Sequence, residues 1–152
     1  MIIAGIDFGD ARTGIAVCDP FEMMASDAGC VKAESYRKAL ALVGDRVREL
    51  RAELVVVGNP VNMDGSLGWR SDKCRAFAEE LAALTGIPTV LYDERLTTVS
   101  AHKILNENNV RGKKRKAVVD TLSARLILED YLTYRRNQAE RQAGEADSSN
   151  QD

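Results

Sequence analysis

The chain has 152 residues, of which 45% are hydrophobic and 29% charged, and its formal net charge is −2. This length suits one domain that buries roughly two-thirds of the surface exposed by its unfolded chain, and the composition excludes a fibrous or largely disordered protein. No apolar run approaches the roughly 20 residues of a membrane span, and Asp7 comes too early for a signal peptide, so we expect a cytoplasmic protein with no membrane partner.

The chain begins with a predicted hairpin. Residues 2–7 and 13–18 are short apolar runs rich in β-formers, and residues 9–12 between them contain the Gly and Asp typical of a turn. A third strand is predicted near residues 29–33.

Helices and strands then alternate. Leu40, Val43, Val47 and Leu50 recur at spacings of three, four and three, which predicts a helix over residues 36–51 with one apolar face. The elements predicted after it are a strand at 54–57, a helix marked by apolar residues from Cys74 to Leu84, a strand at 88–92, a helix from Thr97 or Thr98 to about Leu105, and a helix at 117–135. This order predicts an α/β fold with a mixed sheet and helices on its faces.

Charge is distributed unevenly along the chain. Residues 137–152 hold four acids and one arginine, a net charge of −3, which leaves +1 for residues 1–136. Because the segment 137–152 is polar and nearly without large apolar side chains, we predict a disordered acidic tail after a folded domain of residues 1–136. Five cations occur within the six residues 111–116, and such a run is either a solvated loop or a grip on a phosphate backbone.

The three cysteines are Cys18, Cys30 and Cys74, and they form no paired motif with another Cys or with His. This spacing predicts reduced thiols rather than a disulfide framework or a zinc site.

Three acids fall where an α/β sheet gathers its ligands, beyond the carboxyl ends of its strands. Asp7 ends the first predicted strand, and Glu94 comes just after the strand at 88–92. Asp120 lies in the first turn of the last predicted helix, where the helix dipole favours its ionised form. It shares a face with Ala124, Ile127 and Tyr131, a largely apolar stripe that we expect to face the sheet.

Each acid has a structural alternative when it is considered singly. Asp7 could cap a turn, Glu94 could pair with Arg95, and Asp120 could be an ordinary acid of a helix N-terminus.

Three carboxylates at one sheet edge repel one another unless cations intervene. Carboxylate oxygens suit Mg²⁺ or Mn²⁺, and the lack of clustered His and Cys argues against zinc.

Four segments occur in the order seen in a known family: GIDFG at 5–9, VGNPVNMDG at 57–65, DERLTT at 93–98 and VDTLSA at 119–124. Through them, residues 2–134 resemble the YqgF/RuvX family, RNase H-like proteins named as Holliday junction resolvases and also described as nucleases that process the precursor of 16S ribosomal RNA. The chain has Asn59 where the family commonly has leucine, and Leu122 and Ser123 where it has small residues.

The resemblance implies an RNase H-like fold and an acidic triad of Asp7, Glu94 and Asp120. These residues would bind Mg²⁺ or Mn²⁺ and hydrolyse phosphodiesters with metal-activated water. Arg95 and Arg12 would hold phosphate near the metals, or form surface ion pairs instead. The basic run would track the nucleic-acid backbone through Lys113, Lys114, Arg115 and Lys116.

Three functions stay open at this point. The first is a metal-dependent endonuclease in ribosome biogenesis, with branched DNA as the alternative substrate and a monomer or homodimer as its state. The second is a nucleotide-binding module, because DFG followed by a turn and Gly14 also resembles the first phosphate loop of actin-like ATPases. The third is a noncatalytic nucleic-acid-binding factor, which intact acids at all three positions disfavour.

Overall fold

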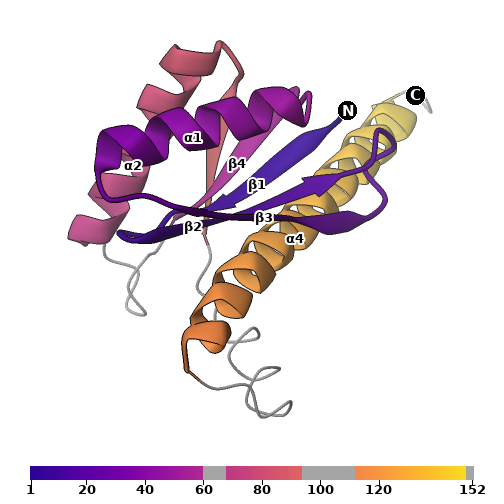
Figure 1. The fold of residues 1–152 in the computed structure, drawn as a ribbon. Helices are drawn as coiled ribbons and strands as arrows, with labels where there is room; N and C mark the ends of the chain where they lie inside the picture. The colour runs from indigo at the N-terminus through magenta and orange to yellow at the C-terminus, as the bar shows by residue number, and fades with distance from the viewer. Residues whose placement is uncertain (60–67, 94–111, 150–152) are drawn as a thin grey trace.

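A computed structural model describes residues 1–59, 68–93 and 112–149, and side chains within the last range from residue 122 to 144. The described residues form one mixed sheet with helices on both faces (Figure 1). In chain order the elements are β1 (Ile3–Asp7), β2 (Arg12–Cys18), β3 (Ala25–Lys32), α1 (Tyr36–Glu49), β4 (Leu54–Asn59), α2 (Trp69–Thr85), β5 (Thr89–Asp93) and α4 (Gly112–Ser149).

The sheet of the described residues has five strands in the order β3-β2-β1-β4-β5. β1, β2 and β3 are antiparallel neighbours, whereas β4 pairs with β1 and with β5 in parallel. The predicted mixed α/β sheet, with an N-terminal hairpin followed by parallel strands, is therefore confirmed. Because β1, β4 and β5 are parallel, their carboxyl ends meet at one edge of the sheet.

The alternation of side chains along the strands separates two cores. Ala4, Ile6 and Val57 point to one face and pack with buried residues of α1 and α2, among them Val43 and Phe77. The other face packs against α4, and its buried members are Ile3, Ala16, Cys18, Leu54, Val56, Ala124, Ile127, Leu128, Tyr131 and Leu132. Both faces of the central strands are covered, which explains the unbroken apolar run of β4.

The ends of α1 and α2 follow from local chemistry. Ser35 caps α1, since its Oγ accepts a hydrogen bond from the backbone N–H of Lys38 at 3.2 Å. Gly86 ends α2 with φ of 72°, a left-handed conformation that glycine adopts without a Cβ penalty. The helices predicted in these two regions are confirmed.

Three predicted elements differ from the structure or lie outside it. β3 begins at Ala25 rather than near residue 29, because it pairs with β2 from Cys18 onward while its polar Ser26 and Asp27 stay exposed at the sheet edge. The helix predicted from Thr97 or Thr98 lies outside the described residues. α4 is longer than the predicted 117–135.

Helical backbone continues through residues 137–149 of the predicted disordered tail, and residues 139–144 are exposed. The domain limit at residue 136 stays a prediction. Among the described helices, α4 included, none combines the length and apolar character needed to cross a bilayer.

α4 crosses β1 at Gly5. A Cβ placed on Gly5 would lie 2.9 Å from Leu128 Cβ and 3.0 Å from the Ala124 carbonyl oxygen. Real Cβ atoms do not approach other atoms this closely, so the helix can lie at this distance from the strand only because residue 5 has no side chain.

We predict that Gly5→Ala lowers the free energy of unfolding by about 1–3 kcal/mol, because the added methyl group meets helix backbone that cannot rotate away. Urea unfolding followed by circular dichroism measures this change. Gly144→Ala is the matched control, since a Cβ there would meet no atom within 4 Å beyond its chain neighbours and its own helix backbone. A Gly5→Ala protein as stable as the control would contradict the close crossing.

Candidate functional site

Asp7 is the last residue of β1 and faces α4. Ile3 belongs to the core beneath α4, and Gly5 contacts that helix directly. Alternation along the strand therefore puts Asp7 on the same face, and its side chain is half-buried. In β2 its partner is Gly14, which has no side chain to cover the carboxylate.

α4 runs antiparallel to β1, so its first turns lie at the Asp7 end of the strand (Figure 1). Near the start of β1, Arg135 Nε donates to Glu22 Oε1 at 2.6 Å, and Glu22 Oε2 pairs with the terminal ammonium of Met1 at 3.1 Å. Farther along β1, Gly5 meets Ala124 and Leu128. The start of β1 therefore lies near residue 135 of α4, and Gly5 lies near residues 124 and 128. Residue numbers fall along α4 as they rise along β1.

The same register brings position 120 toward Asp7. Position 120 is four helical residues before Ala124, a rise of about 6 Å. Asp7 is two strand residues beyond Gly5, a step of about 6.6 Å in the same direction. The buried Ala124, Ile127 and Tyr131 confirm that the predicted stripe faces the sheet. The side chain of Asp120 lies outside the described part of the chain.

Glu94 is the third predicted ligand. It follows Asp93, the last residue of β5, and Asp93 pairs with Asn59 at the end of β4. Glu94 and Arg95 lie outside the described residues. The structure thus describes the strand end that precedes Glu94, at the same edge of the sheet as Asp7.

Some of the predicted phosphate-binding residues lie within the described part of the chain and others do not. Arg12 begins β2, and alternation through Ala16 and Cys18 of the α4-side core puts it on the face that Asp7 occupies. Residues 113–116 form the first turn of α4 after Gly112, at the Asp7 end of the helix, but their side chains are not described. Among the side chains that the structure does describe, no three His, Cys, Asp or Glu residues form a metal-binding group.

Two polar contacts at this edge have no signal in the sequence. The fully buried Ser71 of α2 donates through Oγ to Asn59 Oδ1 at 2.8 Å, and Lys73 Nζ pairs with Asp10 Oδ1 at 3.3 Å. The first contact links α2 to the end of β4, and the second links α2 to the turn after Asp7. Asn59, where the family commonly has leucine, therefore has a structural partner in this chain.

A comparison with known protein families identifies the family of this chain. Residues 1–134 match the family described as RuvX, Holliday junction resolvase. The chain belongs to the RuvX family. This membership confirms the resemblance and the predicted enzyme class, a nuclease.

Relatives of this chain are found in bacteria. A protein of Ruminiclostridium cellulolyticum is 39% identical over 133 residues, 87% of this chain and 94% of the relative. One of Listeria monocytogenes serovar 1/2a is 42% identical over 136 residues, 87% of this chain and 97% of the relative. Both carry the name "Putative pre-16S rRNA nuclease".

Solved structures share the fold of this RuvX chain. Thermus thermophilus RuvC in complex with a Holliday junction substrate has a TM-score of 0.55 and 18% identity, covering 90% of this chain and 96% of RuvC. The fowlpox virus Holliday junction resolvase also has a TM-score of 0.55, with 11% identity over 88% of this chain and 99% of its own. At these identities the comparison confirms the RNase H-like fold.

We predict that Mn²⁺ stabilises the protein against heat through Asp7. A ligand at a hundred times its Kd adds about 2.7 kcal/mol to the stability, which corresponds to a rise in Tm of roughly 5 °C or more for a chain of this size. Differential scanning fluorimetry measures the shift. Asp7→Asn should abolish it, because a neutral amide lacks the anionic oxygens that a hard divalent cation prefers.

Asp45→Asn is the control for the metal shift, since Asp45 is exposed on α1 and pairs with Arg48 at 3.7 Å. It should keep the full response to Mn²⁺. An Asp7→Asn protein that responds to Mn²⁺ as the wild type does would remove Asp7 from the metal site.

Proposed function

We propose that this RuvX-family chain is a metal-dependent endonuclease that cleaves the precursor of 16S ribosomal RNA. The relatives that carry this name align with 87% of the chain, so the proposal concerns the whole described fold. Such a role places the protein in the bacterial cytoplasm. The observation that carries the proposal is the crossing at Gly5, whose register brings position 120 of α4 toward Asp7.

The donor set fits Mg²⁺ or Mn²⁺. Asp7, Glu94 and Asp120 supply carboxylate oxygens, the ligands that these hard cations take in proteins. Asp7 is half-buried at a sheet end where β1, β4 and β5 finish together. When bound there, divalent ions would lower the pKa of the attacking water and neutralise charge on the phosphate.

The chain itself must orient the substrate. Arg12 shares the face of Asp7 and would hold a phosphate there as a positively charged donor, with Arg95 beside Glu94 as a second donor. Arginine suits this task because its planar guanidinium can donate two parallel hydrogen bonds to a phosphate. Asp7, Glu94 and Asp120 would hold the ions, and the arginines would align the scissile bond with them.

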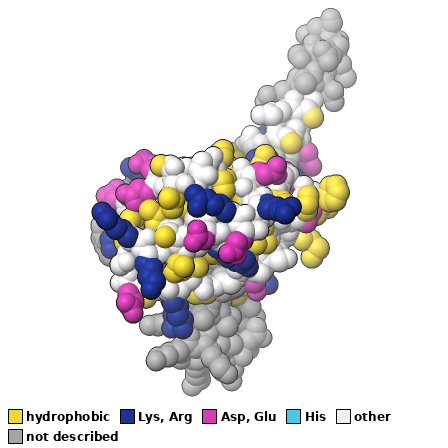
Figure 2. Space-filling model, turned by 45° about the horizontal axis from the view of Figure 1, so that its top comes forward, with side chains coloured by type: hydrophobic (Ala, Val, Ile, Leu, Met, Phe, Trp, Pro, Cys, Tyr) yellow, Lys and Arg dark blue, Asp and Glu magenta, His cyan; other side chains and the backbone are white. Residues whose placement is uncertain are grey.

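The start of α4 would provide the remaining contacts to the nucleic-acid backbone. In Figure 2, which brings the side of α1 and α2 forward, basic and acidic side chains are interspersed over the face that the view shows. A surface of mixed sign binds a phosphate backbone weakly. The four consecutive cations Lys113, Lys114, Arg115 and Lys116 lie instead at the helix end nearest Asp7.

We predict that Asp7→Asn and Glu94→Gln each reduce cleavage of purified precursor 16S rRNA at least about a hundredfold with Mg²⁺ or Mn²⁺, because each loses metal-held charge stabilisation worth several kcal/mol. Cleavage is followed on gels beside a four-way DNA junction of equal concentration. RNA binding and the circular dichroism spectrum should stay unchanged.

The control for this experiment is Asp27→Asn, which removes an exposed carboxylate that pairs with Arg125 at 3.6 Å. Its cleavage rate should equal that of the wild type. Cleavage of the DNA junction alone would move the proposal to branched DNA. Full activity of both Asp7→Asn and Glu94→Gln would refute the mechanism.

We predict that Lys113→Ala combined with Lys114→Ala flattens the salt dependence of RNA binding. Each contact to a single-stranded phosphate contributes about 0.7 to the slope of log K against log salt, so two lost contacts reduce its magnitude by about 1.4. Fluorescence anisotropy between 50 and 300 mM KCl measures the slope.

The matched double variant is Arg136→Ala with Arg141→Ala, which removes two exposed cations from the far end of the same helix. Its salt slope should equal that of the wild type. If both double variants had the same salt slope as the wild type, the basic run would be a solvated segment that does not contact the RNA backbone.

A further inference from the structure

A cavity of about 360 Å³ lies on the sheet face opposite α4, between α1, α2 and the turn after β1. We name it the Glu80 pocket. Its volume falls in the range of pockets that hold small organic ligands. Its wall includes Phe8, Asp10, Tyr36, Ala39, Lys73 and Glu80.

Aromatic rings form one side of the Glu80 pocket. Phe8 stacks on Phe77 with ring centroids 4.3 Å apart and an interplanar angle of 16°. Tyr36 meets both rings edge-on, at 6.1 and 6.3 Å. Phe8 and Phe77 are buried, whereas Tyr36 is 40% exposed, so its ring supplies the aromatic surface that a ligand can reach.

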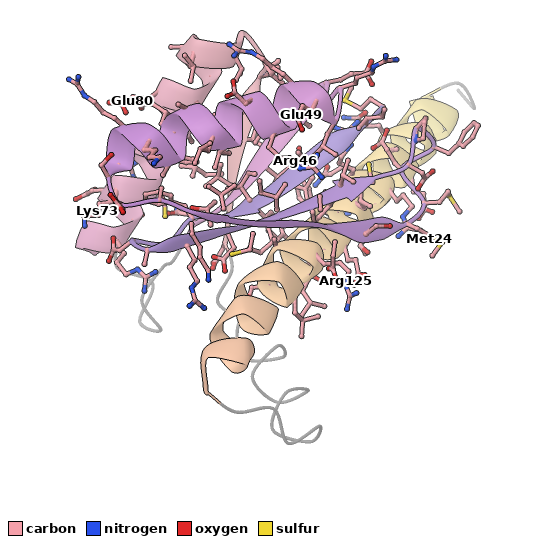
Figure 3. The ribbon with its side chains drawn as sticks, in the orientation of Figure 1. Met24, Arg46, Glu49, Lys73, Glu80 and Arg125 are labelled. Carbon is pink, nitrogen blue, oxygen red and sulfur yellow. The ribbon has the colours of Figure 1, made fainter. Side chains whose placement is uncertain are left out.

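Polar groups lie beside this ring. The Tyr36 hydroxyl donates to Glu80 Oε2, and Lys73 Nζ pairs with Asp10 Oδ1. Glu80 and Lys73 lie two turns apart on α2, at the same end of the molecule (Figure 3). Burial raises the pKa of Tyr36, and its hydrogen bond to Glu80 and the charge of that carboxylate raise it further. The phenol therefore stays protonated and keeps Glu80 in place.

We infer that the Glu80 pocket binds one unpaired base of the RNA substrate and prefers guanine, an inference that rests on the proposed function. Glu80 is an acceptor held at the edge of an exposed aromatic ring. Guanine presents two adjacent N–H donors, the ring N1–H and the exocyclic amine, to such a carboxylate. Adenine presents an acceptor at N1, which the carboxylate repels.

The charge of the pocket supports a base over a phosphate. Asp10 and Glu80 carry two negative charges against the single positive charge of Lys73, so the wall is net negative at neutral pH. A neutral base that brings N–H donors suits this wall, whereas a phosphate would be repelled. Unpaired RNA bases are commonly read in this way, by stacking on an aromatic ring and hydrogen bonds to their edge.

The position of the pocket relates it to the catalytic edge. Phe8 directly follows Asp7, and the Cα atoms of consecutive residues are about 3.8 Å apart. Asp7 faces α4, and Phe8 belongs to the core beneath α1 and α2. A strand of RNA passing over the end of β1 can therefore place a phosphate on one side and a neighbouring base on the other.

The test uses the full-length protein and fluorescein-labelled heptamers of uridine with a central guanine, adenine or inosine. Binding is measured by anisotropy in EDTA, so it does not depend on cleavage. We expect the guanine heptamer to bind about tenfold more tightly than the adenine heptamer, the gain typical of a bidentate contact. Inosine lacks the exocyclic amine and should fall between them.

Glu80→Gln should remove the guanine preference, because the amide offers a donor where guanine needs a second acceptor. Glu79→Gln is the matched control, since it removes the adjacent exposed carboxylate of α2, and it should keep the preference. Tyr36→Leu should weaken binding of all three heptamers, because a stacking surface is lost.

Equal affinities for the three heptamers, or a guanine preference that survives Glu80→Gln, would overturn the inference. A second arm titrates 5′-GMP. Glu80-dependent binding of GMP without any base preference among the heptamers would assign the pocket to a free nucleotide and would also overturn it. The proposed function fails separately, through undiminished cleavage by Asp7→Asn, because the heptamer assay requires no catalysis.

Discussion

The close contact between α4 and β1 at Gly5 is the constraint on which the candidate site depends. With Leu128 Cβ 2.9 Å and the Ala124 carbonyl oxygen 3.0 Å from the position that a Cβ on residue 5 would occupy, the helix backbone lies directly against the strand there. Because packed interiors do not deform continuously, this contact sets which turn of α4 lies beside the end of β1. The Glu22 contacts to Arg135 and Met1 hold the opposite end of the same pair, so two points determine the register.

The sheet then uses its two faces for different tasks. The face under α4 carries Asp7 and Arg12, and the face under α1 and α2 carries Phe8 and the Glu80 pocket. Adjacent residues of a strand point to opposite faces. The end of β1 and the turn after it therefore contribute residues both to the candidate site under α4 and to the Glu80 pocket. Lys73 ties this turn to α2 through Asp10, although a pair as exposed as this one contributes little to stability.

The RNase H-like architecture is shared with resolvases of 11% and 18% identity, which shows how little sequence the fold itself demands. Asn59 accepts a hydrogen bond from the buried Ser71, where a leucine would leave that hydroxyl without this partner. Ser71, twelve positions further along the chain on α2, is thus the polar partner of Asn59 at the end of β4.

The sequence by itself determined the type and order of the described elements, because the spacing of Leu40, Val43, Val47 and Leu50, and the unbroken apolar run at 54–57, are local signals of a helix and a buried strand. It also predicted that Ala124, Ile127 and Tyr131 face the core. The start of β3 was misplaced, since pairing with β2 outweighs the polar character of Ser26 and Asp27. Only the tertiary structure decided that α4 runs antiparallel to β1 at Gly5 and that Tyr36 meets Glu80, because such contacts join residues far apart in the chain, and no local spacing specifies them.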